Sequence, residues 1–258
     1  MTSRGYSLAF PAGAALVVGG TGAIGQAVVG AFAEAGCDVA FTYRRENPRA
    51  KAIAAIVEGA GQQALPLVHD LRCHETAVGL VGAAVEGLGP IHAIVYAAGP
   101  DISTDYVSLT ALAEWMETID TDVNGFFSLV RAAIPHLRQS GGAITAVTTT
   151  ATRRYPGKDV LSAVPKAAVE SLIRAVALEE GRFGIRANAV APGWVDAGLG
   201  ARIIVNEHMG QSNVLATRIL LRRFGAVEEI AAAVMFLSSL QAGYVTGQVM
   251  AVDGGWQI

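Results

Sequence analysis

The sequence contains few of the residues that mark disulfide-rich or metal-binding proteins. Only two cysteines, Cys37 and Cys73, occur in 258 residues, and they do not form a Cys-x-x-Cys pair. The five histidines show neither the His-x-x-x-His nor the His-Glu-x-x-His spacing of metal-binding helices. We therefore expect two reduced, buried cysteines, no metal site and a cytoplasmic protein.

Charged residues and long apolar runs are scarce as well. Charged residues make up 16% of the chain, the net charge is -3 and the pI is about 6.0, which argues against a nucleic-acid partner. No apolar run reaches the roughly 18 residues that span a membrane, so no membrane partner is expected. Segment 8–20 is interrupted by Pro11 and Gly13 and is followed by no signal-peptide cleavage site. We interpret its second half as a strand.

Short apolar segments alternate with longer helical segments along the chain. The predicted strands cover residues 14–19, 38–43, 64–69, 91–97, 142–148, 185–191 and 249–254. The predicted helices cover residues 23–35, 48–60, 74–87, 109–138, 160–181 and 227–239. Continuously apolar strands are typical of a parallel sheet that is covered on both faces. We predict an α/β fold: one Rossmann-type domain over residues 1–258, with a doubly wound parallel sheet of about seven strands and helices on both faces.

A glycine-rich turn, GGTGAIG (residues 19–25), follows the first predicted strand and opens the first helix. Backbone N–H groups at such a helix start are free to bind a pyrophosphate. Gly19, Thr21, Gly22 and Ile24 are the candidate contacts. The alternative is a turn without a ligand, but the strand–turn–helix setting favours a dinucleotide site.

The second predicted strand lacks the terminal acidic residue that would bind the ribose of NAD. Thr42, Tyr43, Arg44 and Arg45 stand there instead, and a guanidinium suits the 2′-phosphate of NADP in charge and geometry. We predict NADP(H) as the cofactor, with a solvated arginine pair as the alternative. Asp70, after the third strand, is placed to accept a hydrogen bond from the adenine amino group.

These motifs together resemble the short-chain dehydrogenase/reductase family, from about Ala14 to Ile258. The glycine turn is similar to the family's TGxxxGxG, with Val18 and Ala23 in place of a threonine and a glycine. The other segments that carry the resemblance are YAAG (96–99, at the family's NNAG), GIRANAVAPGWV (184–195) and TGQVMAVDGGW (246–256). The resemblance implies further cofactor contacts at Leu71, Ala98, Gly99, Lys166, Pro192, Gly193 and Val195.

The resemblance also implies hydride transfer between a nicotinamide and a carbonyl or alcohol carbon. In the family a tyrosine donates the proton, a serine orients the substrate oxygen, a lysine lowers the tyrosine pKa, and an asparagine supports a water relay. Here Lys166 matches the lysine and Thr149 takes the serine position, but Ser162 stands where the tyrosine belongs. Asp122 falls at the asparagine position, with Asn124 nearby.

One branch of the family, the 2,4-dienoyl-CoA reductases, resembles this departure. Its members lack the tyrosine, and the segments VTTT (147–150), NG (124–125) and SAVPK (162–166) are similar to theirs. The mitochondrial type places a tyrosine at the position of Ala151, whereas the nearest tyrosine here is Tyr155. An aliphatic hydroxyl is a much weaker acid than a phenol of pKa about 10, so Ser162 is not expected to donate the proton.

We therefore expect an NADPH-dependent reductase that transfers hydride to a small-molecule carbonyl or conjugated enoyl substrate. Tyr155 or a water would donate the proton, and Thr149, Ser162 and Asn124 would bind the substrate oxygen. C=O and C=C reduction remain open. The alternative is a catalytically inactive NADP-binding sensor or assembly protein.

Three further features are singled out by the sequence. The basic loop Arg153, Arg154 and Lys158 borders the expected site and is either a binding group for a CoA or carrier phosphate or a solvated turn. Trp194 and Trp256 either wall the substrate pocket or pack in the core or an interface. Residues 194–226 depart longest from the strand–helix alternation and are expected to form a flap over the site.

The two longest predicted helices, over residues 109–138 and 160–181, are apolar on more than one face. A helix that is apolar beyond a single stripe needs a second partner. The sequence therefore predicts a homotetramer, with a homodimer as the alternative.

Overall fold

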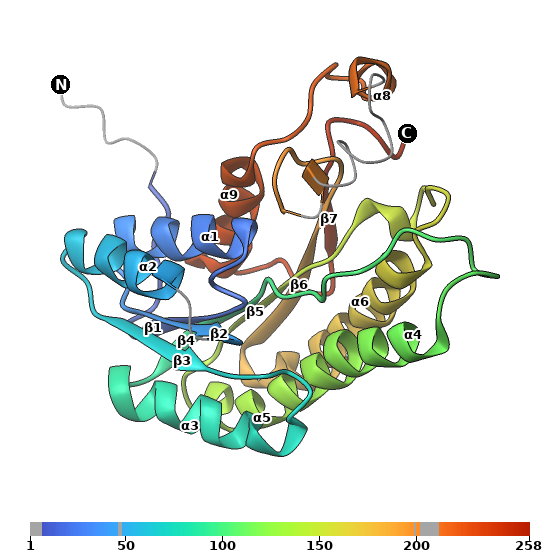
Figure 1. The fold of residues 1–258 in the computed structure, drawn as a ribbon. Coiled ribbons are helices and arrows are strands. Elements are labelled where there is room, and N and C mark those ends of the chain that lie inside the picture. Colours follow the sequence, from blue (N-terminus) through green and yellow to red (C-terminus); the bar gives the residue numbers. More distant parts are fainter. Residues whose placement is uncertain (1–6, 46–47, 199, 202–211) are drawn as a thin grey trace, which may run out of the picture.

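The structure, a computed structural model, describes residues 7–45, 48–198, 200–201 and 212–258. Seven strands form one sheet in the order β3-β2-β1-β4-β5-β6-β7, and each neighbouring pair is parallel (Figure 1). The strands are β1 (Ala14–Val18), β2 (Val39–Tyr43), β3 (Ala64–Val68), β4 (Ile91–Tyr96), β5 (Gly142–Val147), β6 (Ile185–Pro192) and β7 (Val249–Val252). The predicted Rossmann-type sheet is confirmed.

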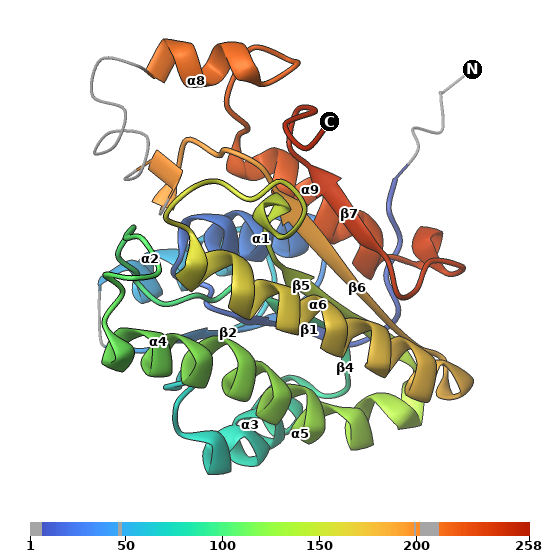
Figure 2. The same ribbon diagram turned by 90° about the vertical axis from the view of Figure 1, so that its right-hand side faces the viewer.

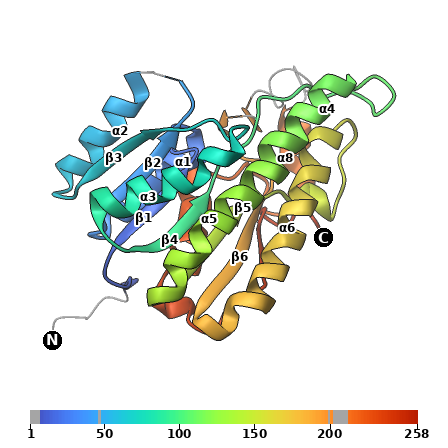
Figure 3. The same ribbon diagram turned by 90° about the horizontal axis from the view of Figure 1, so that it is seen from below.

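Helices cover both faces of the sheet, as predicted. They are α1 (Ala23–Glu34), α2 (Pro48–Gly59), α3 (Ala77–Leu88), α4 (Leu112–Ile119), α5 (Gly125–Ser140), α6 (Val160–Glu180), α8 (Ser212–Arg218) and α9 (Val227–Ser238). One buried cluster joins α1, α2 and α9 to the sheet, and a second joins α3, α5 and α6 to its other face (Figure 3). In Figure 2, α6 lies in front of the sheet with α5 beside it.

The helix predicted over residues 109–138 is interrupted. A π-helical segment, Asp120–Asn124, joins α4 to α5, so each residue in it is rotated away from its place in a regular helix. Such single-turn bulges often occur at functional sites. Asp122 and Asn124, both candidate site residues, lie in this segment.

The inner and outer strands differ in burial. All five residues of β1 are buried, because helices cover both of its faces. At one edge of the sheet β3 is largely half-exposed, and Val68 exposes 65% of its surface. Pro66 lies in this edge strand, where its missing N–H leaves no ladder hydrogen bond unmade.

The chain reverses its direction across the sheet between β1 and β4. β2 and β3 extend the sheet on one side of β1, and the chain then returns to β4 on the other side, where Val18 pairs with Tyr96. In such sheets ligands bind beyond the carboxyl ends of the strands at this reversal. The loops after β1, β4, β5 and β6 therefore meet where a nucleotide site is expected.

Three other expectations have different outcomes. The flap expected over residues 194–226 is described in part, since 199 and 202–211 lie outside the described residues. The prediction of two buried cysteines is wrong for Cys73, which is exposed in the β3–α3 connection, whereas Cys37 is buried. Among the described residues, no helix has both the length and the apolarity needed to cross a bilayer.

Candidate active site

The glycine turn requires glycine at two positions because segments approach closely. Gly19 has a φ of 85°, and a Cβ there would lie 2.8 Å from the backbone of Ala98. A Cβ on Gly25 would lie 2.2 Å from the carbonyl oxygen of Gly19. The helix start therefore packs directly on the turn. α1 begins after Gly22 without a side-chain cap, which leaves first-turn N–H groups available to an anion.

The end of β2 is tied to this turn. The N–H of Gly19 donates to the Thr42 hydroxyl at 3.0 Å, and the N–H of Gly20 donates to the Thr42 carbonyl at 3.0 Å. Thr42 thus holds the turn against β2 instead of facing a ribose. Arg44 and Arg45 follow as exposed residues at the same edge of the sheet.

A cavity of about 980 Å³ lies at the carboxyl ends of β1, β4, β5 and β6. It brings together Thr21, Gly22, Ile24, Ala98, Gly99, Thr149, Ser162, Lys166, Pro192, Gly193 and Val195 from the predicted site. The predicted residues that do not line it are Gly19, Arg44, Arg45, Asp70, Leu71, Asp122, Asn124 and Tyr155. Arg49, Asp101 and Asp159, which were not predicted as site residues, also line it. Arg49 could have been predicted from the sequence, because it follows the predicted arginine pair at the start of the second helix.

Lys166 and Ser162 reach the cavity from the same helix. They are four residues apart on α6, so they lie on one face, one turn from each other. The ammonium of Lys166 donates to the Ala98 carbonyl at 2.9 Å and lies 3.1 Å from both carboxylate oxygens of Asp122. A buried ion pair thus fixes the ammonium at the edge of the cavity.

Asp122 also accepts a hydrogen bond from Tyr96, the first residue of the YAAG segment. The Tyr96 hydroxyl lies 3.2 Å from Asp122 and 3.2 Å from the Thr121 carbonyl, and the side chain is fully buried. Burial, followed by the charge of Asp122, raises the pKa of Tyr96 well above its ordinary value. Tyr96 is therefore a neutral donor that orients Asp122, and it does not line the cavity.

Thr149 is the hydroxyl of the threonine run that remains available. Thr148 and Thr152 each donate to the buried carboxylate of Glu170 at 3.1 Å, and Thr150 donates to the Pro192 carbonyl at 3.1 Å. The Thr149 oxygen accepts from the Ala151 N–H at 3.2 Å, which leaves its own proton for a ligand.

Asn124, predicted to bind the substrate oxygen, and Tyr155, a predicted proton donor, do not line the cavity. The Asn124 amide donates to Asp120 at 3.0 Å on the exposed side of the π-helical segment. Tyr155 exposes 52% of its surface, and partial burial, followed by the charge of Asp159, raises its pKa. The structure thus brings no tyrosine of the described residues into the cavity lining.

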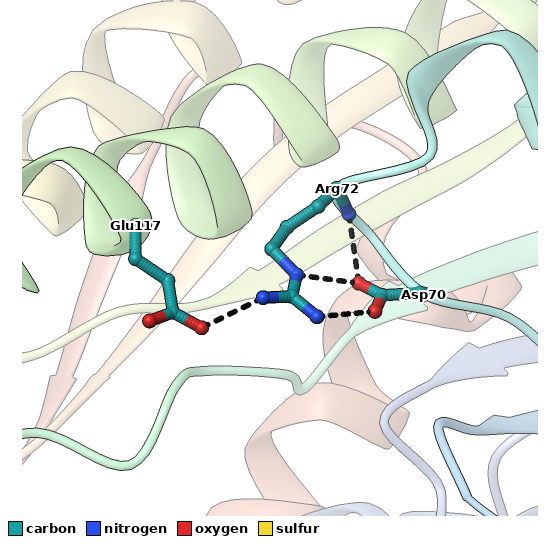
Figure 4. Close-up of polar contacts among 3 residues, drawn as sticks. All are labelled: Asp70, Arg72 and Glu117. Atoms are coloured by element: carbon teal, nitrogen blue, oxygen red, sulfur yellow. Dashed lines mark hydrogen bonds and ion pairs between the residues drawn. The ribbon is translucent and has the colours of Figure 1, made fainter.

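Asp70 is held by a neighbouring arginine (Figure 4). Its carboxylate accepts from Nε, Nη2 and the backbone N–H of Arg72 at 3.0, 2.7 and 3.0 Å, and Nη1 of Arg72 donates to Glu117 on α4 at 2.9 Å. The side-chain hydrogen bonds from Arg72 hold the pKa of Asp70 at about 2. An adenine amino group would have to share this ionised carboxylate with Arg72.

Arg153 and Arg154 lie exposed in a turn, outside the cavity lining, and their side chains contact the C-terminal part of the chain. Arg153 donates to Gln257 at 3.2 Å and to the Val249 carbonyl at 3.1 Å. Arg154 donates to the Trp256 carbonyl and places its guanidinium carbon 4.4 Å from the centre of the Trp256 ring. Both side chains thus contact the C-terminal part of the chain.

Comparisons with known proteins agree with the fold and with the family resemblance. Residues 19–257 match the sequence profile of a family described as "Enoyl-(Acyl carrier protein) reductase". The chain is 31% identical to the L-rhamnose 1-dehydrogenase (NAD(P)(+)) of Sphingomonas sp. (strain SKA58), over 94% of this chain and 95% of that protein. It is 32% identical to the peroxisomal 2,4-dienoyl-CoA reductase of Pongo abelii, over 93% and 82%. A solved short-chain type dehydrogenase/reductase from Mycobacterium ulcerans superposes with a TM-score of 0.90 at 29% identity, over 97% and 91%.

Proposed function

The chain belongs to the short-chain dehydrogenase/reductase family, and we propose that it is an NADP(H)-dependent oxidoreductase that reduces a carbonyl or conjugated enoyl substrate. The observation that carries this proposal is the cavity that gathers Lys166, Ser162 and Thr149 beside the glycine turn. The same cavity is lined by Gly193 and Val195 of the segment after β6. A nucleotide and a small substrate can thus occupy one continuous space.

The residues present fit a dinucleotide. Gly19 and Gly25 form a turn in which a Cβ would clash, and the start of α1, which has no side-chain cap, lines the cavity with Gly22 and Ile24, as a pyrophosphate site requires. Arg49 lines the cavity, and Arg44 and Arg45 stand at the end of β2, where a 2′-phosphate would need cations. When bound, the reduced nicotinamide supplies the hydride. Lys166 is placed to hold the ribose.

Thr149 and Ser162 bind the substrate oxygen in this proposal. Both residues line the cavity, and among the described residues the Thr149 hydroxyl accepts a hydrogen bond from Ala151 and donates none. Hydrogen bonds from two hydroxyls stabilise the negative charge that develops on a carbonyl or thioester oxygen as hydride reaches carbon. The nearby Lys166 ammonium adds to this stabilisation, although Asp122 partly balances its charge.

We propose that a water donates the proton. Tyr155 is half-exposed and lies outside the cavity lining, and the hydroxyl of Ser162 is too weak an acid to replace a phenol. A water held between Ser162 and the mouth of the cavity reaches the substrate from solvent. This arrangement suits both C=O and C=C reduction, and one relative is named a 2,4-dienoyl-CoA reductase.

Turnover assays test the proposal. NADPH consumption is followed with 4-phenyl-2-butanone, crotonyl-CoA and 2,4-hexadienoyl-CoA as substrates. The proposal expects consumption with at least one of them and its loss in Lys166→Ala. Tight NADPH binding without turnover on any of the three supports instead the nucleotide-binding sensor or assembly protein.

We also propose a homotetramer, or otherwise a homodimer, in the cytoplasm. Apolar side chains on three helices are exposed in the single chain: Leu112, Met116, Phe127, Val164 and Leu178. An exposed apolar surface of this kind on long helices suits a symmetric contact with a second copy. Light scattering at micromolar concentration measures the assembly, and a monomer contradicts it.

A further inference from the structure

The last residues of the chain, 253–258, fold back toward the cavity, and we call them the tail. The Asp253 carboxylate accepts from the N–H groups of Gly255 and Gln257, each at 2.9 Å. Gly254 and Gly255 have φ values of 61° and 86°, which lets the chain reverse within these residues. The reversal turns Trp256 inward, where 8% of its surface remains exposed.

The loop after β5 holds the tail from the other side. The Arg154 guanidinium stacks on the Trp256 ring and also donates to the Trp256 carbonyl. Arg153 binds Gln257 and the Val249 carbonyl. Because this loop, residues 148–159, contains Thr149 and leads into α6, which carries Ser162, it joins the tail to the residues that would bind the substrate oxygen.

Trp256 belongs to neither of the two main hydrophobic clusters that hold the helices on the sheet. It forms a third cluster with Leu215 and Ile219, against which Trp194 and Phe224 pack. Its ring meets that of Trp194 edge to face, with centroids 5.9 Å apart. Both tryptophans line the cavity that also contains Ser162.

This wall of the cavity is apolar despite the two arginines beside it. Their guanidinium groups contact Gln257, carbonyls near the C-terminus and the Trp256 ring, and neither arginine lines the cavity. An aromatic pair favours flat, uncharged groups that can stack against its faces and edges. The wall thus suits a flat, uncharged substituent, whereas a basic loop facing the cavity would select an anionic one.

We propose that Trp256, together with Trp194, selects substrates whose reacting carbon carries a flat apolar substituent, and that Arg154 is the positioning residue that holds Trp256 in place. This inference rests on the proposed function, because it concerns the substrate of the same cavity. Unlike the proposed hydride transfer, this selectivity can be tested by binding measurements alone.

Calorimetric titrations of the protein saturated with NADP⁺ test the wall. The probes are 4-phenyl-2-butanone and 2-butanone, neither of which can be oxidised at the carbonyl carbon. We expect the parent to bind the aryl ketone at least about tenfold more tightly than the alkyl ketone. Trp256→Ala should reduce this ratio to within about threefold, and Trp256→Phe should retain most of it.

The role of Arg154 is tested by the same ratio of affinities, because a merely structural role would change the affinity for both ketones equally. Arg154→Met should lower the preference for the aryl ketone without weakening the binding of NADP⁺. Arg154→Lys should recover part of this preference, because an ammonium still donates to the Trp256 carbonyl. Tyr244→Ala is the control, since it removes a fully exposed aromatic ring outside the cavity lining. Its ratio should equal that of the parent.

Any of three results contradicts the proposed role of Trp256. The parent binds the two ketones equally well, the Trp256→Ala variant keeps the parent's ratio of affinities, or that variant loses affinity for NADP⁺ to the same extent as for both ketones. Failure of the proposed function looks different. If the parent binds the aryl ketone preferentially but consumes no NADPH with any substrate, the selectivity of the tryptophan wall is supported and the proposed activity is contradicted.

Discussion

The Lys166 ammonium lies 3.1 Å from the Asp122 carboxylate, in a pair whose side chains expose 11% and 2% of their surfaces. A carboxylate here replaces the asparagine that the family resemblance leads one to expect. Ser162, and not a tyrosine, stands one turn before Lys166 on α6. Asp122 holds the ammonium in place and is itself oriented by Tyr96.

Asp122→Ala should destabilise the protein strongly. Removing one partner of a buried ion pair leaves the other charge uncompensated, and we expect the free energy of unfolding to fall by about 3 kcal/mol. Asp122→Asn keeps an acceptor for Lys166 and should cost about 1 kcal/mol. Urea unfolding at neutral pH measures both values.

The exposed ion pair of Glu117 and Arg72 is the matched control for this comparison. Its side chains expose 51% and 39% of their surfaces, so solvent screens the pair, and Glu117→Gln should change stability by less than about 1 kcal/mol. An Asp122→Ala variant as stable as the Glu117→Gln variant contradicts the structural importance of the buried pair.

The cofactor preference leads to a second prediction. Arg44→Asp should weaken the binding of NADPH far more than that of NADH, because it replaces a cation near the expected 2′-phosphate by an anion. Arg49→Gln removes a cation from the cavity lining and should weaken NADPH by about tenfold, as the loss of a charge-assisted hydrogen bond does. Fluorescence titration with both cofactors measures these affinities.

Lys51→Gln provides the control, since Lys51 lies on the same helix as Arg49, is exposed and does not line the cavity. Its affinities for NADPH and NADH should match those of the parent. A parent that binds the two cofactors equally well shows that the arginines after β2 do not select NADP(H).

The parts of the site that could be predicted from the sequence depend on local geometry. Four residues along a helix place Ser162 and Lys166 on one face, and the carboxyl ends of parallel strands share one edge, which brings Thr149 and Gly193 to them. The strands themselves were predictable because they are continuously apolar and bounded by glycine-containing turns. These relationships need no knowledge of individual side-chain directions.

The rest depends on contacts between distant segments. Arg154 meets Trp256 and Arg153 meets Gln257 across 102 and 104 positions of sequence, so the basic loop gave no sign that the tail would occupy it. The π-helical segment rotates Asp122 toward Lys166 and leaves Asn124 at Asp120, which a regular helix drawn from the sequence does not reproduce. Tyr155, the tyrosine nearest in sequence to Ala151, likewise lies outside the cavity lining.

A third prediction concerns His92, a buried histidine in β4. Its ring lies near Phe10 and Phe32, and neither ring nitrogen has a hydrogen-bond partner among the described residues. Burial lowers the pKa of His92 from 6.5 to about 4. The folded protein therefore binds fewer protons at this site than the unfolded chain, and the stability present above pH 6.5 is lost as the pH falls toward 4.

The loss attributable to His92 amounts to roughly 3 kcal/mol below the folded pKa. His92→Phe removes this titration, so its free energy of unfolding should fall less than that of the parent between neutral pH and pH 4.5. Comparing each protein with itself at the two pH values cancels the packing change that the substitution brings. Equal losses in the two proteins contradict the assignment.

The proton donor is the subject of the last prediction. Ser162→Ala removes a hydrogen bond to an oxygen that becomes negatively charged, and we expect the rate to fall on the order of 10²-fold or less. Lys166→Ala should cost more, because the ribose loses its anchor and the cavity loses its cation as well. Steady-state rates with the best substrate of the assay panel measure both effects.

Tyr155→Phe then separates the two donors that the sequence left open. Because Tyr155 is half-exposed and outside the cavity lining, the rate should change by less than about threefold, as expected when water supplies the proton. A loss as large as that of Ser162→Ala shows instead that the loop brings the Tyr155 phenol to the substrate. If Lys166→Ala leaves the rate unchanged, neither donor applies, because the measured activity does not arise in this cavity.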